Sequence, residues 1–212
     1  MKLVIHNGSR VWGGNEKWLT TLAIGLRERG HDVVVSCRGG GPVQERLGRE
    51  GVPTSPTRPG GELDLPSHLR FARWLRRERP DTLLLTSWNR TPSAVRAARR
   101  ARVPRGVVRL GIVRALPARG RYARAFQRGV DALIVNSTEI RDEWLRSAPW
   151  FPGDAVHVVH NGLRLPAALS RGPDAAGVAA PDPLAIRREL DLPPGVRLLA
   201  GAGHVTHRKG FD

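Results

Sequence analysis

The first 35 residues constrain the fold more than any other part of the chain. Residues 2–6 are a short apolar run with β-branched Val4 and Ile5, which is typical of a strand buried on both faces of a parallel sheet. A turn with glycines follows, then residues 15–29 with apolar side chains at helical spacing, then the apolar run 32–35. This pattern predicts a strand, helix and strand with a right-handed crossover, and so an α/β fold.

The turn between the first strand and the first helix contains the adjacent glycines Gly13 and Gly14. A backbone without Cβ atoms can approach a ligand closely, and the N–H groups of a first helical turn are unpaired, which suits an anionic oxygen. Asn15 is the predicted helix cap, and Gly30 is predicted to end the helix in the left-handed conformation. The spacing matches neither the dinucleotide-binding motif nor the P-loop, so a tight turn without a ligand is the alternative.

The same alternation of strands and helices continues along the chain. Apolar runs predict strands at 52–55, 81–86, 107–113, 131–135 and 155–159, and helical spacing predicts helices at 42–50, 66–79, 91–102 and 119–129. Ser137 is placed to cap a further helix, and Thr91 to cap the helix at 91–102. The prediction is a doubly wound, mostly parallel, Rossmann-like sheet. In such a sheet Ser87, after a central strand, faces the ligand crevice.

Composition changes abruptly after Gly162. Residues 163–183 are rich in Ala, Pro and Gly without periodicity, which is typical of a linker. A short helix is predicted at 184–190 and a new strand at 196–200. We therefore expect a Rossmann-like domain at 1–162, a linker with a short helix at 163–192, and the first strand of a truncated second domain at 193–212.

The formal net charge of +16 comes almost entirely from arginine. Such a surface attracts phosphorylated substrates, acidic lipid head groups or nucleic acid, although a GC-rich genome also favours arginine. Nucleic-acid binding would rest on charge alone, because no helix-turn-helix, RNP or zinc-finger pattern is present, and it is not expected. Basic helical faces at residues 96–105 and 119–128 could instead dock on anionic lipid, and a solvated face is equally compatible.

The sequence has no signal-peptide pattern and no apolar run long enough to span a membrane, so we expect a cytoplasmic protein, with peripheral attachment to the inner face of the plasma membrane left open. Cys37 is the only cysteine, which excludes an internal disulfide, and we expect it to be buried. No metal is expected, because the histidines have no cysteine or carboxylate at ligand spacing.

Five short motifs occur in the order typical of one enzyme family. They are Gly13-Gly14-Asn15-Glu16, Arg29-Gly30-His31-Asp32-Val33, Asn136-Ser137-Thr138-Glu139, Val159-His160-Asn161-Gly162 and the stretch 203–210. Taken together, the chain resembles the N-terminal half of GT-B fold glycosyltransferases of family 4, followed by the start of the donor-binding domain. Those enzymes transfer a sugar, with retention of configuration, from a nucleotide-sugar donor to an acceptor held in a cleft between two Rossmann-like domains.

The resemblance implies site residues in this chain. Gly13 and Gly14 would present N–H groups to a phosphate, and Lys209 would contact the donor diphosphate beside His204, which stands where the family has arginine. Asn15, Ser87, Arg109 and Asn161 are the further substrate-binding candidates at the cleft. Catalytic residues are not identified, because no pair of acids is placed for double displacement.

The same resemblance leaves open whether this chain is an enzyme by itself. The donor-gripping glutamate motif of the family lies in a C-terminal domain that these 212 residues do not contain, so we expect inactivity without it. The donor would be a nucleotide sugar and the acceptor a glycan or lipid-linked molecule, in glycan, lipopolysaccharide or glycolipid biosynthesis. The alternative is a non-catalytic α/β module that binds an acceptor or anionic lipid and acts with a separate partner chain.

Overall fold

The computed structural model describes residues 1–61, 63–86, 88–113, 120–162, 182, 184–193 and 196–198. The chain divides into two compact units, Met1–Leu163 and Arg164–Asp212. The second unit contains α8, Ala185–Glu189, which confirms the predicted helix at 184–190. Residues 196–198, the described part of the strand predicted at 196–200, do not form a strand.

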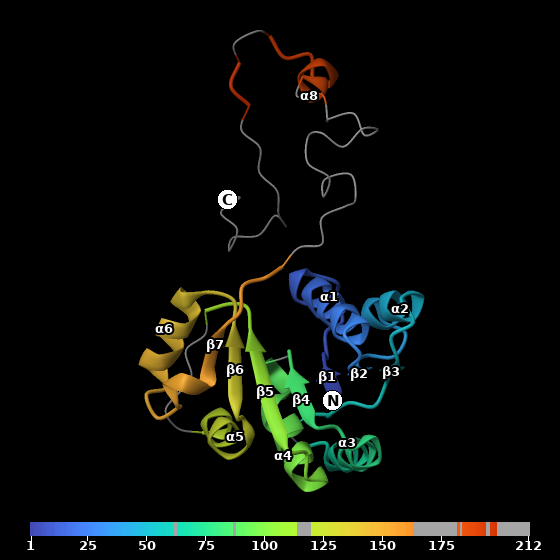
Figure 1. Cartoon of the computed structure of the whole chain (residues 1–212), viewed down its shortest axis with the longest axis vertical. Helices are drawn as coiled ribbons and strands as arrows, with labels where there is room; N and C mark the ends of the chain where they lie inside the picture. The colour runs from blue at the N-terminus through green and yellow to red at the C-terminus, as the bar shows by residue number, and fades with distance from the viewer. Residues whose placement is uncertain are drawn as a thin grey trace. The chain divides into compact units, whose positions relative to one another are not determined.

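The first unit is built on a seven-stranded sheet with the order β3-β2-β1-β4-β5-β6-β7, and its paired strands are all parallel (Figure 1). The strands are β1 Lys2–His6, β2 Asp32–Ser36, β3 Thr54–Ser55, β4 Thr82–Leu85, β5 Arg105–Leu110, β6 Ala132–Val135 and β7 Val156–Val158. This is the predicted doubly wound, Rossmann-like fold. The predicted strand at 107–113 instead ends at Leu110, where its pairing with β6 stops at Val135.

The helices of the first unit follow the strands as the sequence pattern predicts. They are α1 Gly14–Glu28, α2 Pro42–Arg49, α3 Leu65–Glu78, α4 Thr91–Ala101, α5 Arg121–Gly129 and α6 Thr138–Ser147, with short 3-10 turns η1 Trp88–Arg90 and η2 Gly153–Ala155. Ser137 caps α6 as predicted, because its side chain accepts a hydrogen bond from the Ile140 N–H. Thr91 is not a cap: it is the first residue inside α4, and Arg90 precedes it.

Alternate residues of the central strands enter two separate apolar clusters, one on each face of the sheet. On one face, Ile5 and Leu84 pack with Leu19 of α1 and Leu47 of α2. On the other face, the side chains come from β1, β4, β5 and β6 and from helices α3, α4, α5 and α6, with Phe71, Phe126 and Trp144 as the largest. Figure 1 shows α1 and α2 on one side of the sheet and α3, α4 and α5 on the other.

Turn chemistry fixes where several of these elements end. Gly30, after α1, has a φ of 81°, the left-handed conformation predicted for it. Asp64 caps α3 by accepting a hydrogen bond of 3.0 Å from the Ser67 N–H.

Cys37 is completely buried after β2, as predicted, and burial raises the pKa of its thiol to about 11.

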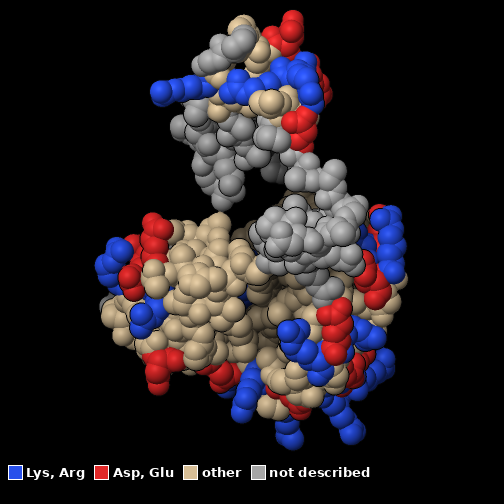
Figure 2. Space-filling view, turned by 45° about the horizontal axis from the view of Figure 1, so that its top comes forward, with Lys and Arg blue, Asp and Glu red and all other residues tan. Residues whose placement is uncertain are grey.

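Basic side chains gather along the lower margin of the first unit in Figure 2, where Figure 1 places α3 and α4. Within the described ranges, no helix is long and apolar enough to cross a membrane.

Candidate functional site

The candidate site lies at the carboxyl ends of β1 and β4, where the strand order reverses. From β1 the chain builds outward through β2 and β3, and it then returns to β4 on the other side of β1. Ligands of open α/β sheets bind outside the carboxyl ends of the strands at such a reversal point. Two polar residues come next in the chain after these strands: Asn7 follows β1 and Thr86 follows β4.

Asn7 and Thr86 are completely or almost completely buried and bind each other. The Asn7 amide donates a hydrogen bond of 3.1 Å to Thr86 Oγ1, and the Thr86 hydroxyl donates one of 3.1 Å to the His6 carbonyl. The Asn7 amide also lies 3.0 Å from Glu16 Oε1 in the first turn of α1. These bonds fix the start of α1 against the ends of both strands.

Asn15 does not cap α1 as predicted. The cap position is taken by Gly13, which is extended and has no side chain to offer, so the first-turn N–H groups receive no side-chain acceptor from it. Asn15 is inside the helix, where its amide donates to the Thr86 carbonyl at 3.3 Å and to Glu16 Oε1 at 3.2 Å. Its own Oδ1 atom accepts a hydrogen bond of 3.0 Å from Arg109.

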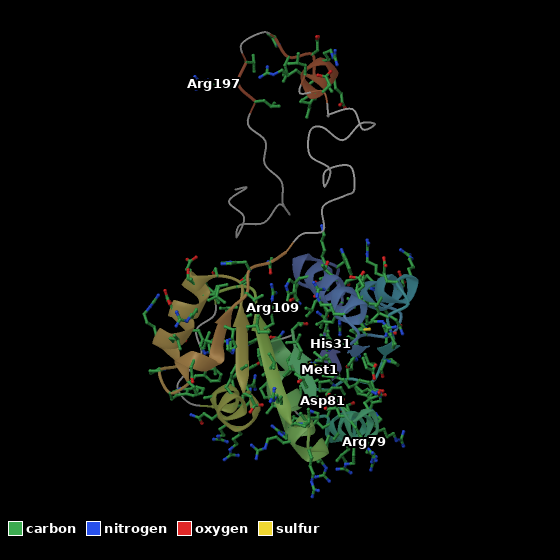
Figure 3. All side chains as sticks on the ribbon, viewed as in Figure 1. Met1, His31, Arg79, Asp81, Arg109 and Arg197 are labelled. Atoms are coloured by element: carbon green, nitrogen blue, oxygen red, sulfur yellow. The ribbon has the colours of Figure 1, made fainter. Side chains whose placement is uncertain are left out.

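Arg109 is the central cation of the site. It belongs to β5, is only 7% exposed, and directs its guanidinium toward α1, with Cζ 4.4 Å from the centre of the Trp18 ring. Nη1 binds Asn15, and Nη2 donates a hydrogen bond of 3.0 Å to Asn161 Oδ1 beyond β7. Burial lowers the pKa of Arg109, and the nearby carboxylate of Glu16 opposes that shift. Figure 3 shows Arg109 at the upper ends of β5 and β6, beside α1.

A glycine makes room for this guanidinium. A methyl group at Gly111 would lie 2.8 Å from Cζ of Arg109, so only glycine leaves the arginine side chain in its present position. At Gly14 the situation is different, because a Cβ atom there would meet no atom within 4 Å. Gly14 therefore borders open space at the exposed start of α1.

His6 is a second buried polar residue at the end of β1. Its Nδ1 atom is 3.0 Å from Ser36 Oγ, and Ser36 donates its only hydroxyl hydrogen to the Thr57 carbonyl at 2.7 Å. His6 therefore carries its proton on Nδ1, and its buried Nε2 has no hydrogen-bond partner among the described residues. Burial lowers the pKa of His6 to about 4, and the charges of Arg58 and Arg90 act in the same direction.

Of the eight residues predicted to form the site, the structure describes five, and these lie around this cluster. Arg109 bonds directly to Asn15 and Asn161, and Gly13 and Gly14 begin the helix that carries Asn15. Ser87, His204 and Lys209 lie outside the described residues.

Sequence reasoning missed Asn7, Thr86 and the hydrogen-bonding role of Glu16. The available signal was a polar residue placed directly after each of two buried apolar runs, since parallel strands bring their carboxyl ends to one edge. No group of three or more possible metal ligands occurs within the described ranges.

This parallel sheet, with a polar site at its reversal point, is the Rossmann-like half of a GT-B fold. The chain is similar to a glycosyltransferase from Rickettsia africae, with a TM-score of 0.68, 16% identity, and coverage of 92% of this chain and 50% of that one. It is also similar to HepE of Anabaena in complex with UDP, with a TM-score of 0.65, 16% identity, and coverage of 90% and 50%.

The family follows from the sequence itself. The family model described as Glycosyltransferase Family 4 matches residues 12–165, and the chain belongs to that family. No curated protein matches the chain by sequence. The same fold also occurs in the UDP-GlcNAc 2-epimerase of Neisseria meningitidis bound to UDP-GlcNAc, with a TM-score of 0.55, 15% identity, and coverage of 76% and 47%. The chain thus spans about half the length of these solved structures.

Proposed function

We propose that this protein is a glycosyltransferase that moves a sugar from a nucleotide-sugar donor to an acceptor. Family membership supports the class of reaction. The observation that carries the proposal for this chain is the contact of Arg109 with both Asn15 and Asn161 at the reversal point of the sheet. A cation held at the edge where such sheets bind ligands suits a substrate that carries phosphate.

The proposed roles at the site follow from the local chemistry. The first-turn N–H groups of α1, beginning at Gly14, point at a phosphate oxygen, and the open space beside Gly14 lets that oxygen approach. Arg109 stabilises negative charge nearby. Lys209 and His204 would add contacts to the donor diphosphate, and Ser87 would line the same edge.

The proposed chemistry relies on positioning and electrostatics. Glu16 is 6% exposed, and its Oε1 accepts hydrogen bonds from two asparagine amides, so it does not serve as a free nucleophile. The acceptor hydroxyl would attack the anomeric carbon from the face that the donor phosphate leaves, so the glycosidic bond forms as the bond to phosphate breaks, and the configuration is retained. The departing phosphate would take up the acceptor proton. Preorganised donors then stabilise the charge that develops on that phosphate.

The donor would be a UDP-sugar, as in the solved relatives that hold UDP or UDP-glucose. The acceptor would be a glycan or lipid-linked molecule, and contact with an anionic membrane surface would use the exposed arginines of α4 and α5. We propose that turnover needs a donor-binding domain beyond the first unit. The relatives are about twice as long as the part that the chain covers, which supports this requirement.

An assay of UDP release tests the function. The protein is incubated with UDP-glucose, UDP-galactose or UDP-GlcNAc and a membrane or glycan extract, alone and together with a separately expressed donor domain. If the protein transfers sugar, UDP should be released only when the acceptor is present. The rate of this release should fall in the Asn15→Asp variant, because the new carboxylate repels the donor phosphate. Acceptor binding without UDP release under either condition would favour the non-catalytic module, and a change at C2 of the donor sugar would favour an epimerase.

A further inference from the structure

A groove separate from this site lies between α3 and the segment after β3. Its volume is about 560 Å³, within the range of small-molecule sites. Its lining residues are Arg58 and Thr57 on one side and Arg70, Arg73, Trp74 and Arg77 of α3 on the other, with Pro56 and Ser67. We refer to it as the α3 groove. Among the described residues that line it, none carries a carboxylate.

The three arginines that α3 contributes to the groove share one face of the helix. Arg70, Arg73 and Arg77 are spaced by three and four residues, which places their side chains next to one another. Like charges at this spacing repel and destabilise a helix. A bound anion would remove that repulsion.

Two described carboxylates near the groove, those of Asp64 and Glu78, are engaged elsewhere. Asp64 caps the helix at the Ser67 N–H, although Arg70 lies close enough to help lower its pKa, and Glu78 pairs with Lys2 at 2.8 Å. Arg70 donates a hydrogen bond of 2.7 Å to Ser67 Oγ. Within the described part of the chain, Arg58, Arg73 and Arg77 form no ion pair with a carboxylate.

An aromatic ring lies among these cations. Trp74 stacks on the completely buried Phe71, with ring centres 5.6 Å apart, so the core holds the indole in place. A fixed indole at the wall of a groove can pack against the apolar face of a sugar ring. Guanidinium groups and one such ring together suit a phosphate attached to a carbohydrate.

Hydrogen bonds connect the α3 groove to the reversal point of the sheet. Thr57 accepts the hydroxyl hydrogen of Ser36, and Ser36 in turn binds His6 at the end of β1. The Thr57 end of the groove is therefore linked by hydrogen bonds to His6 at the carboxyl end of β1.

We propose that the α3 groove binds the phosphate of a phosphorylated sugar head group, with the arginines on the phosphate and Trp74 on the ring. This inference rests on the proposed function, because the head group would be part of the acceptor in the proposed sugar transfer. The phosphate could be that of a free sugar phosphate or of a lipid head group, and the test separates these sources. A groove of this volume fits one head group better than an extended nucleic acid.

The test compares two variants of equal net charge. Arg73→Gln/Arg77→Gln removes two cations from the groove, and Arg96→Gln/Arg100→Gln removes two exposed cations at the same spacing on α4. Calorimetric titration with glucose 1-phosphate forms one arm, and sedimentation with phosphatidylcholine vesicles containing phosphatidylinositol forms the other. We expect the groove variant to lose at least about tenfold in affinity for whichever of the two ligands the wild-type protein binds, whereas the α4 variant should change the affinity for glucose 1-phosphate by less than about twofold.

The Trp74→Leu variant tests whether the indole contacts the sugar ring of the ligand. It should weaken glucose 1-phosphate or vesicle binding while leaving the affinity for inorganic phosphate unchanged. The proposal is overturned if the wild-type protein binds neither ligand at physiological salt, if the groove variant keeps its affinity, or if the groove and α4 variants lose affinity for glucose 1-phosphate equally. If the groove variant loses affinity as expected but no UDP is released from a donor, the proposed binding site in the α3 groove is supported and the proposed transfer reaction is contradicted.

Discussion

The guanidinium of Arg109 and the side-chain amide of Asn161 meet across 52 residues of sequence, with Nη2 3.0 Å from Oδ1. The other arm of the same guanidinium binds Asn15, so one side chain holds β5, the start of α1 and the segment after β7 together. A buried charged donor that serves two amide oxygens is expected to contribute to stability as well as to any ligand contact.

Replacing Arg109 with Met should lower the free energy of unfolding by about 1–3 kcal/mol, because the oxygens of Asn15 and Asn161 lose their donor. Arg109→Lys should recover only part of this loss, since one ammonium cannot reproduce the planar fork. Urea unfolding measures both variants. Arg105→Met, at the exposed start of the same strand, is the control, and equal losses at positions 105 and 109 would contradict the assigned role.

Gly14→Ala should separate stability from binding. Its Cβ meets no atom within 4 Å, so alanine should raise the helix stability by about 0.5–1 kcal/mol. The same methyl group would stand in the space proposed for a phosphate, so the affinity for UDP should fall. Gly48→Ala in α2, which also meets no atom within 4 Å, should give the stability gain without the loss of affinity. Unchanged UDP affinity in both variants would argue against a phosphate at Gly14.

The pKa of His6 predicts a loss of stability in mild acid. The folded protein holds this pKa at about 4, against an ordinary histidine pKa of 6.5, so between these pH values the unfolded chain binds a proton that the folded chain does not. The free energy of unfolding should be unaffected by this group above about pH 6.5, and it should fall by about 3 kcal/mol as the pH decreases to about 4. The free energy of unfolding should be measured at several pH values over this range. It should depend less steeply on pH in the His6→Gln variant, whereas a substitution of the exposed His157 should leave the pH dependence unchanged.

Gly106→Ala should be strongly destabilising for a steric reason. A Cβ atom at this position of β5 would overlap the carbonyl oxygen of Gly129 and lie 3.3 Å from its carbonyl carbon. Backbone atoms cannot rotate away, so a loss of about 1–3 kcal/mol is expected. Thermal unfolding tests this, and a melting temperature within error of the wild type would show that the contact can relax.

The order of strands and helices was predictable because it depends on local periodicity. Each apolar pattern lies within one short segment of the sequence, as in the runs of β1, β4 and β6 and the apolar face of α1. Asn15 shows where this reasoning fails. A capping preference is local, but the partner that decides the orientation of Asn15 is Arg109, at a separation of 94 residues.

The candidate site was predictable only in part for the same reason. The sequence indicates Arg109 and Asn161 as separate candidates, and nothing in their spacing shows that they bind each other. Asn7 and Thr86 meet because β1 and β4 are neighbours in the sheet, and strand order is not encoded in any single segment.

The two apolar clusters on opposite faces of the sheet have an evolutionary consequence. Because β1, β4 and β5 separate them, a volume change under α1 or α2 is not transmitted directly to the aromatic side chains around Trp144. Substitutions can therefore accumulate in the packing beneath α1 and α2 while the aromatic packing on the opposite face of the sheet is retained.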